Sequence, residues 1–313
     1  MEGRDVPKYL IVNADDLGIS VPTNLAVGRA FRRGLVTSAS LMANMPATTH
    51  AVERIVRPNP GLGVGIHLCL TSGRPVLPAP EVPLLVGPDG HFKHGFLGLL
   101  RLVHWRRCGE ALEQIERELA AQARRIDALG VTVDHVDSHQ HVHMIPEVFS
   151  LATSLARARQ AALRFADERL APRHFRPRAL AGYCSHGGIP KKLLLSWLAR
   201  SIRRRYPDLT ITARYFGILD AGRMTSAALR QIVRGLPEGV SEIGLHPGLA
   251  AWLEDSLECS RADRRFLRRA ERAAELAAAL DPALRADLVG EGIVPARFRD
   301  VLPSGAARRI APA

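Results

Sequence analysis

The chain of 313 residues is 47% hydrophobic and 24% charged, so it can bury a sizeable core without disulfides. This composition excludes a disordered, collagen-like or low-complexity protein. The four cysteines form no CxxC pair, which argues against a zinc knuckle or a disulfide framework and favours a reducing compartment. The formal net charge of +12 suits a nucleic-acid or anionic-membrane partner, but an arginine-rich composition explains it equally well.

The sequence shows neither a signal peptide nor a membrane-spanning segment. Residues 1–8 carry charge and a proline where a signal peptide would have its apolar stretch. No uninterrupted apolar run approaches the roughly 18 residues of a membrane span. We therefore expect a cytoplasmic protein that is neither exported nor membrane-spanning.

Apolar runs alternate with helical spacings along the first half of the chain. The predicted elements are strands at 9–14, 36–44, 62–70 and from about 131 into DHVDSHQHVH, and helices at 21–33, 50–57 and 112–129. Residues 73–95 hold five prolines and four glycines and predict a long irregular loop. Loops of that length often serve as functional lids.

The second half continues the alternation, with strands expected at 162–166, 210–217 and 241–246 and helices at 191–205, 225–235 and 260–280. This order predicts an α/β fold with a parallel sheet, most simply a (β/α) barrel, irregular variants included. A doubly wound open sheet is the alternative, although no Gly-rich turn follows the first strand. We expect a single catalytic domain over 1–313 with a helical, basic C-terminal extension from about 260.

Polar residues follow several of the predicted strands, and strand carboxyl ends meet at one rim in such folds. Asp15 and Asp16 end the first strand, and His67, His139 and His246 end later ones. Adjacent residues of an extended segment point to opposite sides, so the two aspartates should have different roles. One could bind a metal and the other act as a general base, although either could merely cap the helix that follows.

The segment Asp137-Ser138-His139-Gln140-His141-Val142-His143 is the least ordinary part of the chain. A strand would place residues 137, 139, 141 and 143 on one face, where four ionisable groups are costly to bury without partners. A metal ligand, a carboxylate behind it and substrate-binding imidazoles would explain them together. One aspartate with two histidines suits one divalent ion, with zinc, magnesium, manganese and nickel all open, and His246 could donate a proton.

With these residues the chain resembles the YdjC-like carbohydrate deacetylases, the family that includes chitooligosaccharide deacetylase. The segments IVNADDLG, VGIHLCL, DSHQHVHMIPEV and GLHPG carry the resemblance, with Leu17 standing where the family has phenylalanine. The resemblance implies a barrel-like fold and metal-dependent removal of an N-acetyl group from an amino sugar. It also implies a homodimer, which is common among relatives.

Carried over by position, the resemblance makes Asp16, His67 and His139 the metal ligands, Asp15 the general base and His246 the general acid. Asp137, His141 and His143 would bind substrate or support the ligands. The SASLMAN and GRPVLP segments are most similar to a branch associated with hopanoid biosynthesis, which implies an N-acetylglucosaminyl hopanoid lipid as substrate.

Residues 191–205 and 96–107 are both apolar and basic, as expected of helices lying on anionic lipid at the inner membrane face, or of ordinary outer helices packed on a sheet. Soluble chitooligosaccharides are the alternative substrate, and a two-metal phosphoesterase is the alternative enzyme. A basic nucleic-acid-binding protein would leave the aspartates and histidines unexplained, so we expect no nucleic-acid partner.

Overall fold

The computed structural model describes residues 6–104, 108–169, 183, 188–207, 213–249 and 259–301. Part of the strand expected at 210–217, part of the helix expected at 96–107, and Cys184 lie outside the described residues. Within the described residues, no helix is both long and apolar enough to cross a membrane.

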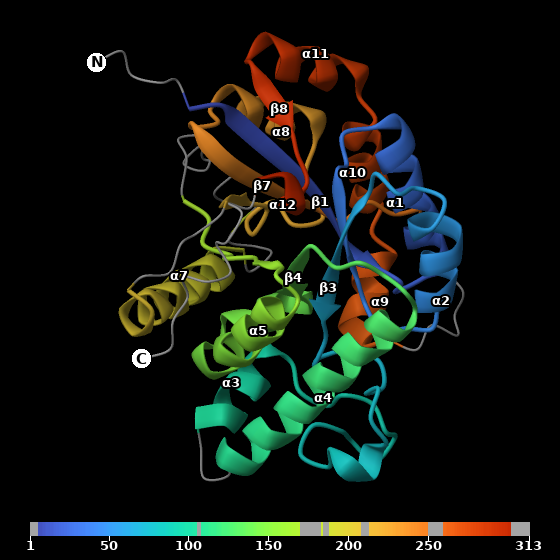
Figure 1. The fold of residues 1–313 in the computed structure, drawn as a ribbon, viewed down its shortest axis with the longest axis vertical. Helices are drawn as coiled ribbons and strands as arrows, with labels where there is room; N and C mark the ends of the chain where they lie inside the picture. The colour runs from blue at the N-terminus through green and yellow to red at the C-terminus, as the bar shows by residue number, and fades with distance from the viewer. Residues whose placement is uncertain are drawn as a thin grey trace.

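One parallel sheet organises the molecule (Figure 1). Its strands are β1 Lys8–Leu17, β2 Ser38–Leu41, β3 Gly63–Leu68, β4 His135–Ser138, β5 Ala162–Leu163, β6 Arg214–Phe216, β7 Gly239–Leu245 and β8 Ile293–Pro295. Every ladder between them is parallel. The predicted α/β class is therefore confirmed.

The strand order distinguishes a barrel from a doubly wound sheet. It runs β5-β4-β3-β2-β1-β7-β6, so the first five strands follow one another in chain order and a late strand returns to the other side of β1. A doubly wound sheet would reverse direction near its middle. No ladder between the described residues joins β5 to β6, and β8 pairs only with the first residues of β1. The result is the irregular, half-barrel form of the expected fold.

Helices cover the outside of this sheet. They are α1 Val21–Arg33, α2 Thr48–Ala51, α3 Phe96–His104, α4 Cys108–Ala128, α5 Pro146–Ala158, α7 Gly188–Arg205, α8 Ser226–Arg234, α9 Arg261–Leu267, α10 Glu271–Ala279, α11 Pro282–Gly290 and α12 Phe298–Val301. A π-helix at Val52–Val56 extends α2, and 3-10 turns occur at Ala79–Glu81 and His139–Met144. The single helix expected at 260–280 is wrong: residues 268–270 separate α9 from α10.

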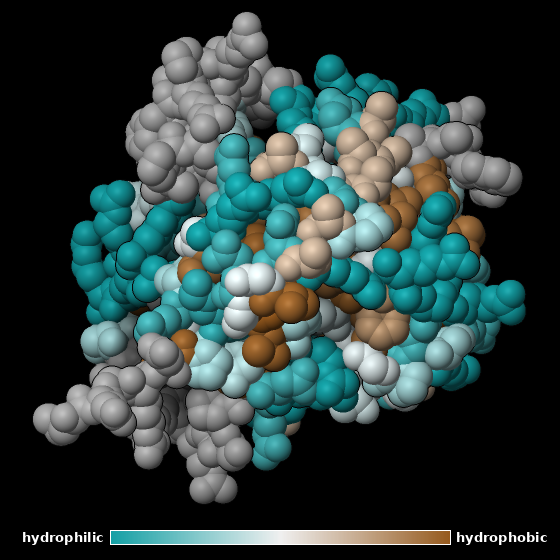
Figure 2. All heavy atoms as spheres, turned by 90° about the horizontal axis from the view of Figure 1, so that it is seen from above, coloured by the Kyte–Doolittle hydropathy of each residue, from teal (hydrophilic) through white to brown (hydrophobic). Residues whose placement is uncertain are grey.

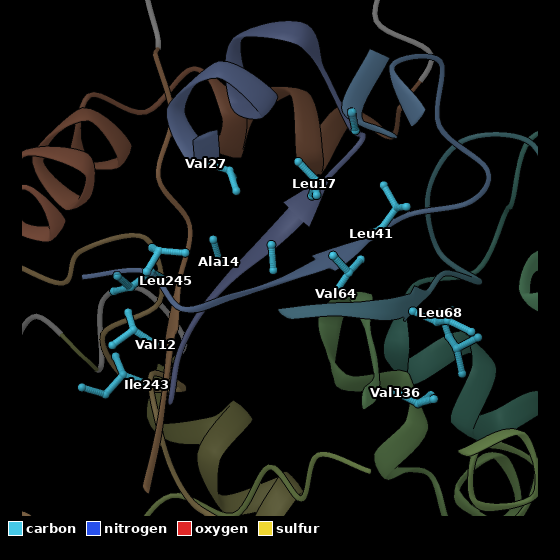
Figure 3. Packing of buried hydrophobic residues seen from close by; sticks show 14 of the residues in the cluster. Val12, Ala14, Leu17, Val27, Leu41, Val64, Leu68, Val136, Ile243 and Leu245 are labelled. Atoms are coloured by element: carbon cyan, nitrogen blue, oxygen red, sulfur yellow. The ribbon is translucent and has the colours of Figure 1, made fainter. Parts of the chain in front are cut away.

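Side-chain alternation gives the two faces of the sheet opposite character. On β1, Leu10, Val12 and Ala14 belong to the core cluster beneath the helices, and Figure 3 shows Val12, Ala14, Ile243 and Leu245 in that layer. The other face carries Ile11, which clusters with Ala162 and Phe298, and otherwise buried polar side chains: Asn13, Asp15, Ser38, Ser40, His67, His135, Asp137 and Glu242. An ordinary barrel interior is filled with branched apolar side chains. This one holds a hydrogen-bonded polar network instead.

The irregular loop expected at 73–95 is confirmed apart from the short turn at Ala79–Glu81, and α4 anchors it. Glu118 accepts hydrogen bonds from the backbone N–H groups of Val76 and Leu77, at 2.9 and 3.0 Å. Gln114 accepts another from the backbone N–H of Leu84, at 2.9 Å. These side chains fix the course of the loop over α4.

Candidate metal and catalytic site

The carboxyl end of β1 brings both adjacent aspartates to one rim. The ladder with β2 shifts register between Ala14 and Leu17, and Asp16 has a left-handed φ of 66°. This bulge overrides simple alternation, so the expectation that the two side chains diverge is wrong. Ser20, not either aspartate, caps α1 by accepting a hydrogen bond from the N–H of Thr23. The carboxylates are therefore free of the capping role.

Two imidazoles meet one oxygen of Asp16. Asp16 Oδ1 lies 2.9 Å from His139 Nδ1 and 3.5 Å from His67 Nε2. Asp16 Oδ2 is buried and has no hydrogen-bond partner among the described residues. One potential ligand atom from each of Asp16, His67 and His139 lies within 4.8 Å of the others. An orphaned oxygen beside two nitrogens is the donor set that a divalent ion takes, so these residues fit the expected metal.

The sheet itself sets the position of His67. Its partner in the β3–β4 ladder is Asp137, and His67 Nδ1 lies 2.8 Å from Asp137 Oδ1. Burial would lower the pKa of His67, but the charge of Asp137 and the hydrogen bonds with Asp137 and Asp16 outweigh it and raise that pKa to about 9. Asp137 thus holds the His67 ring on the side opposite Asp16.

Asp15 has different surroundings, dominated by an arginine. Both of its oxygens accept hydrogen bonds from the Arg164 guanidinium, at 2.8 and 2.9 Å. The same guanidinium contacts Asp137 Oδ2 at 2.6 Å and Glu242 Oε1 at 2.7 Å. Burial would raise the pKa of Asp15, but Arg164 outweighs it and holds the pKa below its ordinary value. Asp15 is therefore an ionised carboxylate fixed in orientation.

No role in the site was predicted for Arg164, although it lies within the apolar run expected to form a strand at 162–166. An arginine among buried positions is itself a signal of paired carboxylates. Asp15, His67 and Asp137 form a second possible ligand group. However, Arg164 bonds to both of these carboxylates, so the positive charge that they require is already present.

His246 follows β7 and reaches the same rim. Its Nε2 lies 3.8 Å from Asp15 Oδ2, and its ring packs edge-on against Phe266 at 5.4 Å. Glu275 accepts a hydrogen bond of 2.6 Å from the His246 backbone N–H, which anchors the loop to α10. Burial lowers the pKa of His246 to about 4 against the opposing charge of Asp15.

The single-face arrangement expected for residues 137 to 143 is wrong. β4 ends at Ser138, and Gln140 and His141 adopt left-handed φ values of 55° and 61° inside a 3-10 turn. His143 consequently turns inward, where its ring nitrogens contact Ser138 Oγ at 2.5 Å and the Arg164 carbonyl at 3.1 Å.

His141 leaves the strand face in the same turn. Its ring packs against Tyr215 with 5.7 Å between ring centroids, and its buried Nδ1 has no hydrogen-bond partner among the described residues. Of the three histidines in this segment, only His139 contacts Asp16 in the described structure.

These features define an α/β protein with an irregular barrel, at whose carboxyl rim Asp16, His67 and His139 form a group that could hold a metal ion. A family model described as YdjC-like protein matches residues 9–289. The chain belongs to the YdjC-like family.

Named relatives are similar over part of their length. A carbohydrate deacetylase of Geobacillus stearothermophilus is 47% identical over 48% of this chain and 57% of that protein. A chitooligosaccharide deacetylase of Salmonella paratyphi B is 41% identical over 50% of this chain and 59% of that protein. The matched region thus spans somewhat more than half the length of each relative.

A solved structure is similar in fold over 95% of the chain. A protein from Enterococcus faecalis V583, titled as a cellobiose-phosphate cleavage protein, superposes with a TM-score of 0.69 and 22% identity. The superposition covers 95% of this chain and 100% of that one. At this identity the likeness concerns the fold alone.

Proposed function

We propose that this protein is a metal-dependent hydrolase that removes the N-acetyl group from an amino sugar. The observation that carries the proposal is the meeting of Asp16, His67 and His139 beside an independently held carboxylate, Asp15, and a rim histidine, His246. The names of the similar carbohydrate and chitooligosaccharide deacetylases support the reaction class.

The metal ligands are Asp16, His67 and His139, and a divalent ion held by them would supply Lewis-acid activation of the acetamide and of water. Asp15 removes a proton from the attacking water as general base. The water oxygen bonds to the acetyl carbon, the C–N bond breaks, and acetate and a free amine result.

His246 acts as the general acid, and its surroundings determine how it receives a proton. With a pKa of about 4, its imidazole is neutral near pH 7 before the reaction. The proton taken by Asp15 lies next to His246 Nε2, since the two side chains are 3.8 Å apart. We therefore assign a relay in which Asp15 passes this proton to His246, which delivers it to the leaving amine.

A two-metal phosphoesterase is the competing enzyme, and the charge distribution disfavours it. Such sites need carboxylates that bridge a second ion. The second candidate group includes Asp15 and Asp137, and Arg164 already bonds to both of them. A single ion with an adjacent base is the arrangement that these residues support better.

The finer substrate assignment is an N-acetylglucosaminyl hopanoid lipid, with soluble chitooligosaccharides as the alternative. Leu193 and Trp197 of α7 are each 56% exposed, while Leu195, Leu198 and Ile202 pack inward. Such an outer stripe, followed by basic residues, favours contact with a membrane surface. Figure 2, which views the molecule from above, shows a mostly hydrophilic surface with hydrophobic residues in small patches.

The test is acetate release from an N-acetylglucosaminyl lipid and from chitobiose, with and without chelator. Release that chelator abolishes is the expected result, and release from chitobiose alone would discard the lipid. His67→Ala and His139→Ala should lose metal and activity together, whereas Asp15→Asn should keep metal and lose about 10²- to 10⁴-fold in kcat. His104→Ala, on the exposed end of α3, is the control. Phosphate release from a phosphoester, without acetate release, would overturn the proposal.

A further inference from the structure

The imidazoles of His67 and His139 share an arrangement that the proposed metal ligation explains for only one nitrogen of each ring. Each ring directs one nitrogen toward Asp16 and the other toward a buried carboxylate. For His67 that carboxylate is Asp137, at 2.8 Å from Nδ1. For His139 it is Asp263, whose Oδ1 lies 2.9 Å from Nε2. Asp263 comes from α9 and belongs to none of the motifs noted in the sequence.

Asp263 is buried and is held by the start of its own helix. Its side chain is 6% exposed. Ser260, the N-cap of α9, donates a hydrogen bond to Asp263 Oδ2 at 2.5 Å and accepts one from the Asp263 N–H at 3.1 Å. The Ser260 N–H in turn donates to Ser72 Oγ at 3.0 Å, in the loop that follows β3. This chain of contacts fixes the start of α9 against the site.

We propose that Asp263 is a positioning residue that holds His139 with Nδ1 turned toward Asp16. A carboxylate that accepts a hydrogen bond from Nε2–H leaves the lone pair on Nδ1, which selects the tautomer able to bind a metal there. The inference rests on the proposed function, because it concerns a ligand of the proposed metal. It extends the site to α9 and assigns to Asp263 the role that Asp137 has for His67.

Metal affinity of the purified, metal-free protein tests this role apart from catalysis. Zn²⁺ binding is titrated in wild type, Asp263→Asn and Asp263→Ala, with thermal unfolding of each protein as the folding control. Loss of a carboxylate behind a histidine ligand typically weakens metal binding about 10- to 100-fold. We expect losses of that size in both variants, with the asparagine variant at the wild-type Tm.

Asp281→Asn is the matched control. Asp281 also begins a helix, capping α11 by accepting a hydrogen bond of 3.0 Å from the Ala283 N–H, but it has no contact with the site residues among those described. Its substitution should leave Zn²⁺ affinity unchanged. Nitrogen-15 NMR of the His139 ring in the Zn²⁺-loaded proteins provides a second readout: wild type should show Nε2 protonated and Nδ1 bound to the metal, and Asp263→Ala should lose this preference.

The outcomes separate the two proposals. If wild type binds no Zn²⁺ stoichiometrically, the proposed metal site fails and this inference fails with it. Should wild type bind Zn²⁺ while Asp263→Asn and Asp263→Ala bind it equally well with an unchanged tautomer, only the role of Asp263 is overturned.

Discussion

The two histidines beside Asp16 are placed by different parts of the fold. His67 lies within β3, and its supporting carboxylate is its ladder partner on β4. His139 lies beyond the end of β4, in a turn with left-handed residues, and its supporting carboxylate comes from α9. The contrast teaches that sheet register alone can build half of such a site, while the other half depends on tertiary contacts between distant segments.

The electrostatics of the two sides also differ. Behind His67, the Arg164 guanidinium contacts Asp15, Asp137 and Glu242, and all of these side chains are buried. Behind His139, Asp263 is paired with the imidazole itself and with a serine hydroxyl. The strand side therefore depends on one buried cation, and the helix side on hydrogen bonds.

The largest expected effect follows from removing that cation. Arg164→Met leaves three carboxylates buried without their counter-charge, which should reduce the free energy of unfolding by about 3–5 kcal/mol. Asp263→Ala removes the carboxylate that accepts hydrogen bonds from His139 and Ser260 and should cost about 1–3 kcal/mol. Urea denaturation of both variants measures the difference.

The control for Arg164 is Arg159→Met, which breaks the 2.5 Å ion pair with Asp127, where the aspartate is 48% exposed. Exposed pairs of this kind contribute at most about 1 kcal/mol. Equal losses for Arg164→Met and Asp263→Ala would show that the two sides of the site are supported alike, contrary to the comparison.

A second prediction concerns the turn that carries His139. Burial lowers the pKa of His143 in this turn to about 4, from an ordinary value of 6.5, although Asp137 opposes the shift. Because the native pKa lies below the unfolded value, the unfolded state binds more protons between these pH values. This group's contribution to stability is complete above pH 6.5 and falls, by on the order of 3 kcal/mol, as the pH drops toward 4.

Urea denaturation at a series of pH values between 7.5 and 4 tests the effect of His143. In His143→Gln the free energy of unfolding should depend less steeply on pH than in wild type over this interval. His104→Gln, at an exposed position, serves as the control and should keep the wild-type slope. A variant slope as steep as that of wild type would mean that His143 binds a proton as readily in the native protein as in the unfolded chain.

The strand side of the site was the more predictable from the sequence. Short apolar runs predict strands that end near Asp15, Asp16, His67 and His246, and parallel strands bring such ends together. The bulge at Asp16 was not predictable, since a backbone register shift leaves no trace in the pattern of apolar residues.

The helix side of the site, where Asp263 of α9 contacts His139, could not be predicted from local sequence patterns. The alternation of polar residues predicts a strand that continues to His143. The same alternation occurs in an irregular turn, so the sequence does not distinguish the two. Asp263 lies in a Ser-x-x-Asp sequence that indicates only the start of a helix. Its contact with His139 joins residues 124 positions apart, which only the tertiary structure reveals.

The smallest expected effect separates the cap of α9 from its proposed second task. Ser260→Ala removes the N-cap and should cost about 1 kcal/mol of stability, as Thr225→Ala should at the cap of α8, where Thr225 accepts from the Ala228 N–H at 3.2 Å. Ser260 also orients Asp263, so its loss should weaken Zn²⁺ binding, though less than Asp263→Asn does, while Thr225→Ala leaves binding unchanged. Parallel Zn²⁺ titrations and urea denaturation measure both quantities. If the two variants lose equal stability and neither loses affinity, α9 supports the fold without setting the orientation of His139, and the helix side of the site would then be placed by the turn alone.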